Sequence, residues 1–136
     1  MASYRKLSDI GYSKNKENYE KIINVTQIKT IQDKENLIRS NKVCVIDVYA
    51  DWCGPCKLIA PEFEKLFKKY NINGVCALAK EDVELKLSPS VKVVPTTQFY
   101  IDGKFDSIVT GADLEGIENK IKELLKENFS NEPPKQ

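Results

Sequence analysis

The chain has 136 residues, of which 41% are hydrophobic, and this length and composition fit a single domain with its own apolar core. The 21 basic and 20 acidic residues leave a net charge of +1, so the charge balance suggests neither nucleic acid nor an anionic membrane as a partner. Histidine is absent, which removes the commonest general base and metal ligand, so any proton chemistry must use carboxylate, lysine or thiol groups.

The first 19 residues form a polar segment without the apolar run that signal peptides and membrane spans contain. We therefore expect a cytoplasmic protein without membrane contact, whose four cysteines are thiols by default in that reducing compartment. A mobile extension is the simpler interpretation of residues 1–19. The alternative is a segment that docks on the domain or on a partner through apolar and aromatic side chains, namely Tyr4, Leu7, Ile10, Tyr12 and Tyr19.

The first half of the remaining chain alternates strand and helix patterns. A first strand is predicted at Ile22–Thr26, followed by an amphipathic helix over Thr30–Ser40 whose lysine, glutamate and asparagine side chains should face solvent. The apolar block Val43–Tyr49 predicts a strand buried on both faces. Helical spacing then continues from Cys53 to about Tyr70, and Val75–Ala79 predicts another buried strand. Such a strand, helix and strand order implies a parallel pair with a right-handed crossover and helices on both faces of the sheet.

The second half predicts a hairpin and a last helix. Thr96–Ile101 and Lys104–Thr110 are strand patterns separated by Asp102-Gly103, a dipeptide suited to tight primed turns, so the two strands should be antiparallel. Asp113 is a plausible N-cap for a final amphipathic helix that ends near Phe129. Residues 130–136 are expected to be a disordered tail.

A pair of cysteines, Cys53 and Cys56, lies where a predicted strand ends and a helix begins. Unpaired N–H groups and the positive end of the helix dipole favour a thiolate on the first sulfur, and the second, one turn further on, can attack a mixed disulfide formed there. The Cys-x-x-Cys spacing therefore predicts redox chemistry. The alternative is half of a zinc site, which needs four ligands, but Cys44 and Cys76 fall on predicted buried strands. These two are expected to be small core residues, or else a regulatory thiol.

Two further residues near the cysteines attract attention. Asp47 lies in the middle of a buried apolar strand, where a carboxylate is costly unless it is paired or protonated. It is predicted either to exchange protons with the site or to serve as a structural acid that accepts from a backbone group. Trp52 precedes the first cysteine and is predicted to line a contact surface, with packing alone as the alternative.

The string Trp52-Cys53-Gly54-Pro55-Cys56-Lys57 resembles the active site of the thioredoxin family letter for letter, and the resemblance extends over roughly residues 20–129. It implies an α/β thioredoxin fold with a central mixed sheet of about five strands and helices on both faces. It also implies an extension at 1–19, a domain at 20–129 and a tail at 130–136.

The resemblance also implies roles for residues outside the string. Asp47 matches the buried acid of the family, and Lys80 matches the lysine that ends the next strand near that acid. Val94-Pro95-Thr96 resembles the cis-proline loop, and Gly111 resembles the glycine before the last helix. The stretch Lys80–Val94 departs from the family, because its helix, around 82–90, is shortened and contains Ser88-Pro89, so a stub or an irregular loop is expected.

By this resemblance the protein is a thiol-disulfide oxidoreductase that reduces disulfides in client proteins. Cys53 is the expected nucleophile, Cys56 the resolving thiol, and Asp47 with Lys80 the proton-handling pair. The expected client-binding surface consists of Trp52, Gly54, Pro55, Val94, Pro95 and Gly111. Electrons are expected from an NADPH-dependent thioredoxin reductase, with no cofactor bound by this chain.

Two alternatives remain open at this stage. One is a specialised thioredoxin-like protein with few clients, and the other is a non-enzymatic docking subunit that keeps only the fold.

Overall fold

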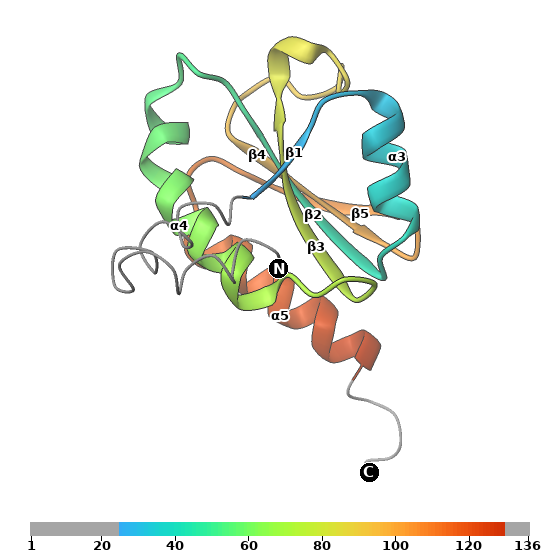
Figure 1. Ribbon diagram of the computed structural model, residues 1–136. Helices are drawn as coiled ribbons and strands as arrows, with labels where there is room; N and C mark the ends of the chain where they lie inside the picture. The colour runs from blue at the N-terminus through green and yellow to red at the C-terminus, as the bar shows by residue number, and fades with distance from the viewer. Residues whose placement is uncertain (1–24, 130–136) are drawn as a thin grey trace, which may run out of the picture.

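The computed structural model describes residues 25–129, and Figure 1 shows a twisted sheet with helices on both of its faces. The predictions for residues 1–24 and 130–136 lie outside the described residues. The elements in chain order are β1 Thr26–Ile28, α3 Ile31–Arg39, β2 Val43–Tyr49, α4 Gly54–Tyr70, β3 Cys76–Asp82, the 3₁₀ turn η2 Val83–Leu85, β4 Thr96–Ile101, β5 Lys104–Thr110 and α5 Leu114–Phe129.

The five strands form one mixed sheet in the order β1-β3-β2-β4-β5. β1, β3 and β2 are parallel, whereas β4 is antiparallel to β2 and β5 is antiparallel to β4. The parallel pair of β2 and β3 is joined through α4, as predicted. This arrangement confirms the α/β fold with a central mixed sheet of five strands expected from the sequence.

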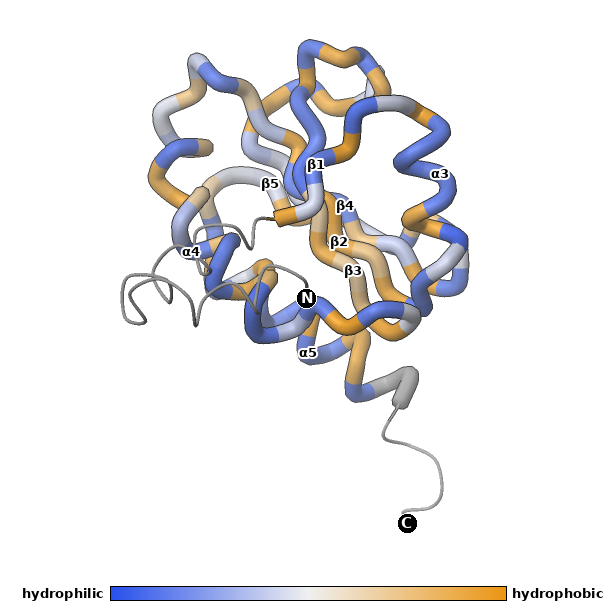
Figure 2. The backbone as a smooth tube through the Cα atoms, in the orientation of Figure 1, coloured by the Kyte–Doolittle hydropathy of each residue, from blue (hydrophilic) through white to orange (hydrophobic). Residues whose placement is uncertain are grey.

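The sheet separates two apolar cores, because successive residues of a strand point to opposite faces. Figure 2 shows hydrophobic residues concentrated along the central strands. The core beneath α4 and α5 includes Val45, Phe63, Phe99 and Ile117. The core on the α3 face is built from Ile28, Cys44, Ile46, Val48, Ala77 and Ala79.

Helix α3 begins where the sequence predicted, but one of its lysines is not where we expected it. Thr30 caps the helix, since its Oγ1 accepts from the N–H of Asp33 at 3.0 Å while Asp33 accepts from the Thr30 N–H at 3.2 Å. Lys34 was predicted to face solvent with the other charged residues, yet it is only 5% exposed. The reason is its position three and four residues before Leu37 and Ile38, which places it on the helix face that packs on the sheet.

Two strands have different bounds from those predicted. β1 is the short segment Thr26–Ile28, so the strand begins where the predicted Ile22–Thr26 strand was expected to end. β3 does not end at Lys80 but continues to Asp82. The charged residues after Ala79 are not typical of a buried strand, so the sequence did not predict this continuation. These residues are strand because they pair with β2 up to Tyr49.

The hairpin and the shortened segment match the sequence predictions. Asp102 and Gly103 connect β4 to β5 with φ of 52° and 81°, the positive values that a primed turn requires. Between β3 and β4 there is only the single turn η2 instead of a full helix, and residues 86–95 are irregular. Among residues 25–129 no helix is long and apolar enough to cross a membrane.

Candidate active site

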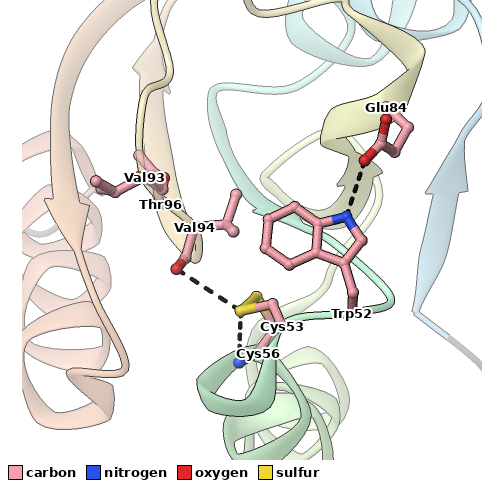
Figure 3. Close-up of a disulfide and its surroundings, with 7 residues drawn as sticks. All are labelled: Trp52, Cys53, Cys56, Glu84, Val93, Val94 and Thr96. Carbon is pink, nitrogen blue, oxygen red and sulfur yellow. Dashed lines mark hydrogen bonds between the residues drawn. A yellow bond between two sulfur atoms is a disulfide. The ribbon is translucent and has the colours of Figure 1, made fainter.

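Cys53 and Cys56 form a disulfide at the first turn of α4 (Figure 3). Cys53 is the N-cap, and the Cys56 backbone N–H donates to its sulfur at 3.1 Å. Pro55 occupies the first turn, where its missing N–H leaves no helical bond unmade. The helix therefore directs an N–H group and its positive end at Cys53, an arrangement that favours a thiolate when the disulfide is reduced.

A second segment approaches the sulfur from the start of β4. The Val94 carbonyl oxygen lies 3.6 Å from Cys53 Sγ, and Figure 3 shows Val94 facing the disulfide. The Val94–Pro95 bond is cis, as predicted. Val93, just before it, is 55% exposed, and its carbonyl accepts from Thr96 Oγ1 at 2.7 Å. The backbone beside the disulfide is thus held at a fixed position and borders solvent.

The predicted glycines and Pro55 lie around the same point. Gly54 and Pro55 are exposed at the start of α4. Gly111 has φ of 84°, in the left-handed region that favours glycine, and its N–H donates to the Pro95 carbonyl at 2.8 Å. Gly111 therefore supports the Val94–Pro95 segment from the far end of β5.

Trp52 lies at the surface beside the disulfide, with 68% of the residue exposed. Its indole N–H donates to Glu84 Oε2 at 2.8 Å (Figure 3). The N–H of Glu84 in turn donates to Asp82 Oδ1 at 2.9 Å. This exposure contradicts the alternative that Trp52 only packs. Glu84 could not be found from the sequence, because the two partners are 32 residues apart and no local pattern joins them.

Asp47 is buried behind the cysteines, on the α4 side of the sheet. A cavity of about 110 Å³ is lined by Asp47, Cys56 and Lys80 together with neighbouring residues. Burial raises the pKa of Asp47 from 3.8 to about 6, and the nearby Lys80 charge opposes the rise. Within the described residues Asp47 Oδ1 has no hydrogen-bond partner, so that oxygen is able to take part in proton exchange.

Lys80 is the residue of β3 directly beside Asp47 in the parallel ladder, so both side chains lie on one face of the sheet. Its ammonium lies 4.6 Å from the centroid of the Tyr49 ring, within cation–π range. The Tyr49 hydroxyl accepts from Gln27 Nε2 at 3.0 Å. The ring, the lysine and the acid therefore line the same cavity.

Cys44 and Cys76 do not join the site. Both are buried thiols, and burial raises the pKa of each to about 12. Cys44 belongs to the core on the α3 face and Cys76 to the core on the α4 face, so the sheet separates them. Within residues 25–129 no group of three or more histidine, cysteine, aspartate or glutamate side chains is placed to hold a metal ion.

Comparisons with known proteins agree with this geometry. The sequence model of the family described as Thioredoxin matches residues 13–123. The chain is 36% identical to the thioredoxin of Coprinus comatus over 106 residues, which cover 74% of this chain and 98% of the relative. It is 39% identical to a thioredoxin of Borreliella burgdorferi over 96 residues, which cover 68% and 82% of the two chains.

Solved structures of thioredoxins are also similar to this chain. The oxidised form of mitochondrial thioredoxin 3 from Saccharomyces cerevisiae is similar with a TM-score of 0.64 at 33% identity, and the match covers 73% of this chain and 94% of that one. The thioredoxin of Plasmodium falciparum has a TM-score of 0.66 at 26% identity, with 73% and 98% covered.

Proposed function

Because this chain belongs to the thioredoxin family, we propose that it serves a broad set of client proteins in the cytoplasm. It is a protein-disulfide reductase that works by dithiol exchange at Cys53 and Cys56. We propose that it receives its electrons from an NADPH-dependent thioredoxin reductase. Thioredoxins in general act on client disulfides and are recharged by such a reductase. The observation that supports the proposal most directly is the Cys53–Cys56 disulfide at the N-terminus of α4, beside the Val94 backbone.

In the proposed reaction the Cys53 thiolate attacks one sulfur of a client disulfide. A Cys53–client disulfide forms and the other client sulfur leaves as a thiolate. The Cys56 thiolate then attacks Cys53 Sγ, which releases the second client thiol and forms the Cys53–Cys56 disulfide. Two electrons pass to the client, and the protein is oxidised by the same number.

Asp47 is assigned as the group that accepts the Cys56 proton in the resolving step. It shares the small cavity with Cys56, and its pKa of about 6 lies close enough to neutral pH for both protonation states to be reached. Lys80 is assigned a supporting role, since its charge favours the carboxylate that must be present before the proton is taken.

Client binding is assigned to the backbone of Val93 and Val94, in the manner of strand addition, with Trp52 providing apolar contact. An extended client segment on this backbone would place its disulfide against Cys53. Gly54 and Pro55 are exposed next to Cys53 and add no large side chain there.

A specialised reductase with few clients is the narrower alternative, and it is not favoured by the comparisons. The rim between β3 and β4 carries only the turn η2 and an irregular stretch up to residue 95. A pure docking subunit is not favoured, because the Cys53–Cys56 pair and its surroundings are intact.

Insulin reduction coupled to thioredoxin reductase and NADPH tests the proposal. The native protein should turn over many times, Cys53→Ser should be inactive, and Cys56→Ser should accumulate a mixed disulfide. Cys44→Ser is the matched control, because that thiol is buried away from the site, and it should keep native turnover. Slow insulin reduction with normal reductase coupling would support the narrower function, and no turnover by the native protein would refute the proposal. Fluorescence of the tagged chain in cells tests the compartment.

A further inference from the structure

A buried polar cluster lies on the α3 face of the sheet, opposite the side of Asp47. It consists of Lys34 from α3, Glu81 from β3, Ser88 from the irregular segment and Gln98 from β4, all of them buried. The four residues are brought together from across the chain, up to 64 residues apart. None of them takes part in the exchange reaction.

The cluster is joined by one ion pair and four hydrogen bonds. Lys34 Nζ forms an ion pair with Glu81 Oε1 at 2.7 Å and donates to Ser88 Oγ at 2.7 Å and to Gln98 Oε1 at 3.0 Å. The Ser88 hydroxyl donates to Glu81 Oε2 at 2.7 Å and also accepts from Gln98 Nε2 at 3.2 Å. Ser88 therefore uses its single donor and both of its acceptor positions.

Stability alone gives a weak reason for such a cluster. A buried ion pair loses much of its Coulomb attraction to desolvation, and well-packed apolar residues of similar volume are often as stable. What polar contacts add is direction, because a hydroxyl with three fixed partners has one position, whereas an apolar side chain can slide over its neighbours. The cluster therefore locates Ser88 more sharply than packing would.

Ser88 connects this anchor to the client-facing backbone. Its carbonyl accepts from the Val91 N–H at 3.0 Å, and both Val91 and Val94 pack on the apolar core of the α3 face. The Val94 carbonyl then lies 3.6 Å from Cys53 Sγ. Val91 and Val94 hold the segment through apolar packing, whereas Ser88 holds it through side-chain hydrogen bonds to Glu81 of β3 and Gln98 of β4.

We propose that Lys34, Glu81, Ser88 and Gln98 form a positioning cluster that fixes segment 86–94, and with it the Val93–Val94 client-binding backbone, relative to Cys53. The part of this inference that concerns clients rests on the proposed function. The cluster acts on client binding and not on catalysis. It sets the position of an extended client on the backbone and leaves the reactivity of the cysteines unchanged.

The test compares Ser88→Ala with Ser90→Ala, an exposed serine of the same segment. Ser88→Ala should raise the KM for insulin about tenfold with kcat nearly unchanged, because client seating is lost and chemistry is kept. Reduction of the small disulfide 5,5′-dithiobis(2-nitrobenzoate) by the pre-reduced variant, and the Cys53–Cys56 redox potential, should stay native. Ser90→Ala should resemble the native protein in every assay.

Hydrogen exchange gives a readout that does not depend on any client. The Val91 amide should exchange about tenfold faster in Ser88→Ala than in the native protein, while amides of β2 and α4 keep their protection. Unchanged exchange at Val91, or an equal loss of protection throughout the domain, would overturn the proposal. A native KM for insulin in Ser88→Ala, or a parallel loss of activity on the small disulfide, would overturn it too. Failure of the native protein to reduce insulin would refute the proposed function, and the exchange data would still decide whether Ser88 anchors the segment.

Discussion

Replacing Asp47 by asparagine should stabilise the oxidised protein at neutral pH. Asp47 is almost fully buried, and burial raises its pKa from 3.8 to about 6. A pKa that is higher in the folded state means that the folded protein holds the proton more tightly. The resulting contribution to stability is complete below about pH 3.8 and is lost as the pH rises through about 6. At pH 7 the native protein therefore carries a buried carboxylate that opposes folding.

The size of the effect follows from the pKa. The rise corresponds to about 3 kcal/mol between the protonated and ionised forms. Asparagine avoids the charge but brings an amide whose N–H groups need partners in the same small cavity, at a cost of about 1 kcal/mol. Asp47→Asn should then raise the free energy of unfolding by about 2 kcal/mol at pH 7, whereas at pH 4, where the folded acid is protonated, the amide cost remains and the variant should be no more stable than the native protein.

Urea unfolding of the oxidised form at pH 4 and pH 7 measures both values. Asp51→Asn, which replaces an exposed acid next to the site, is the control and should change the free energy of unfolding by less than about 0.5 kcal/mol. A destabilised Asp47→Asn at pH 7 would refute the reasoning and show that the Lys80 charge compensates the carboxylate fully. The same variant should also accumulate mixed disulfide during turnover, because the acceptor for the Cys56 proton is missing.

Three further outcomes are expected from the buried residues. Cys44 and Cys76 should resist iodoacetamide in the folded protein and become labelled only on unfolding, since both are buried and their pKa is raised to about 12. Mass mapping that finds either cysteine labelled while the protein is still folded would contradict this. Lys34→Met should lower the free energy of unfolding by about 3 to 5 kcal/mol because it leaves Glu81 buried without its partner, and urea unfolding measures this. The double variant Lys34→Met with Glu81→Leu should lose clearly less, and an equal loss would show that Lys34 and Glu81 are not energetically coupled. Phe63→Ala should cost about 3 to 5 kcal/mol through the cavity it leaves in the α4 core, and a loss below about 1 kcal/mol would mean that the core collapses around it.

The parts of the protein that depend on neighbours in the chain could be predicted from the sequence. The Cys53–Cys56 spacing at a strand–helix junction needs only a few consecutive residues, and the structure has that disulfide at the first turn of α4. The Asp102-Gly103 turn follows equally from local backbone preference. Thr30 as the cap of α3 is another case, because its hydrogen bonds reach only three residues along the chain.

The features that only the tertiary structure decided arise where distant segments meet. The spacing of Lys34 from Leu37 and Ile38 places it on the buried face of α3. Nothing near it in the sequence shows that Glu81 and Gln98 will contact it on that face of the sheet. The last residues of β3 become strand because β2 pairs with them up to Asp82 and β1 pairs with Lys80 and Glu81. A buried charge, or a strand of charged residues, is stable only where residues distant in the chain provide its partners. The order and register of the strands decide which residues these are, and no local sequence pattern contains that information.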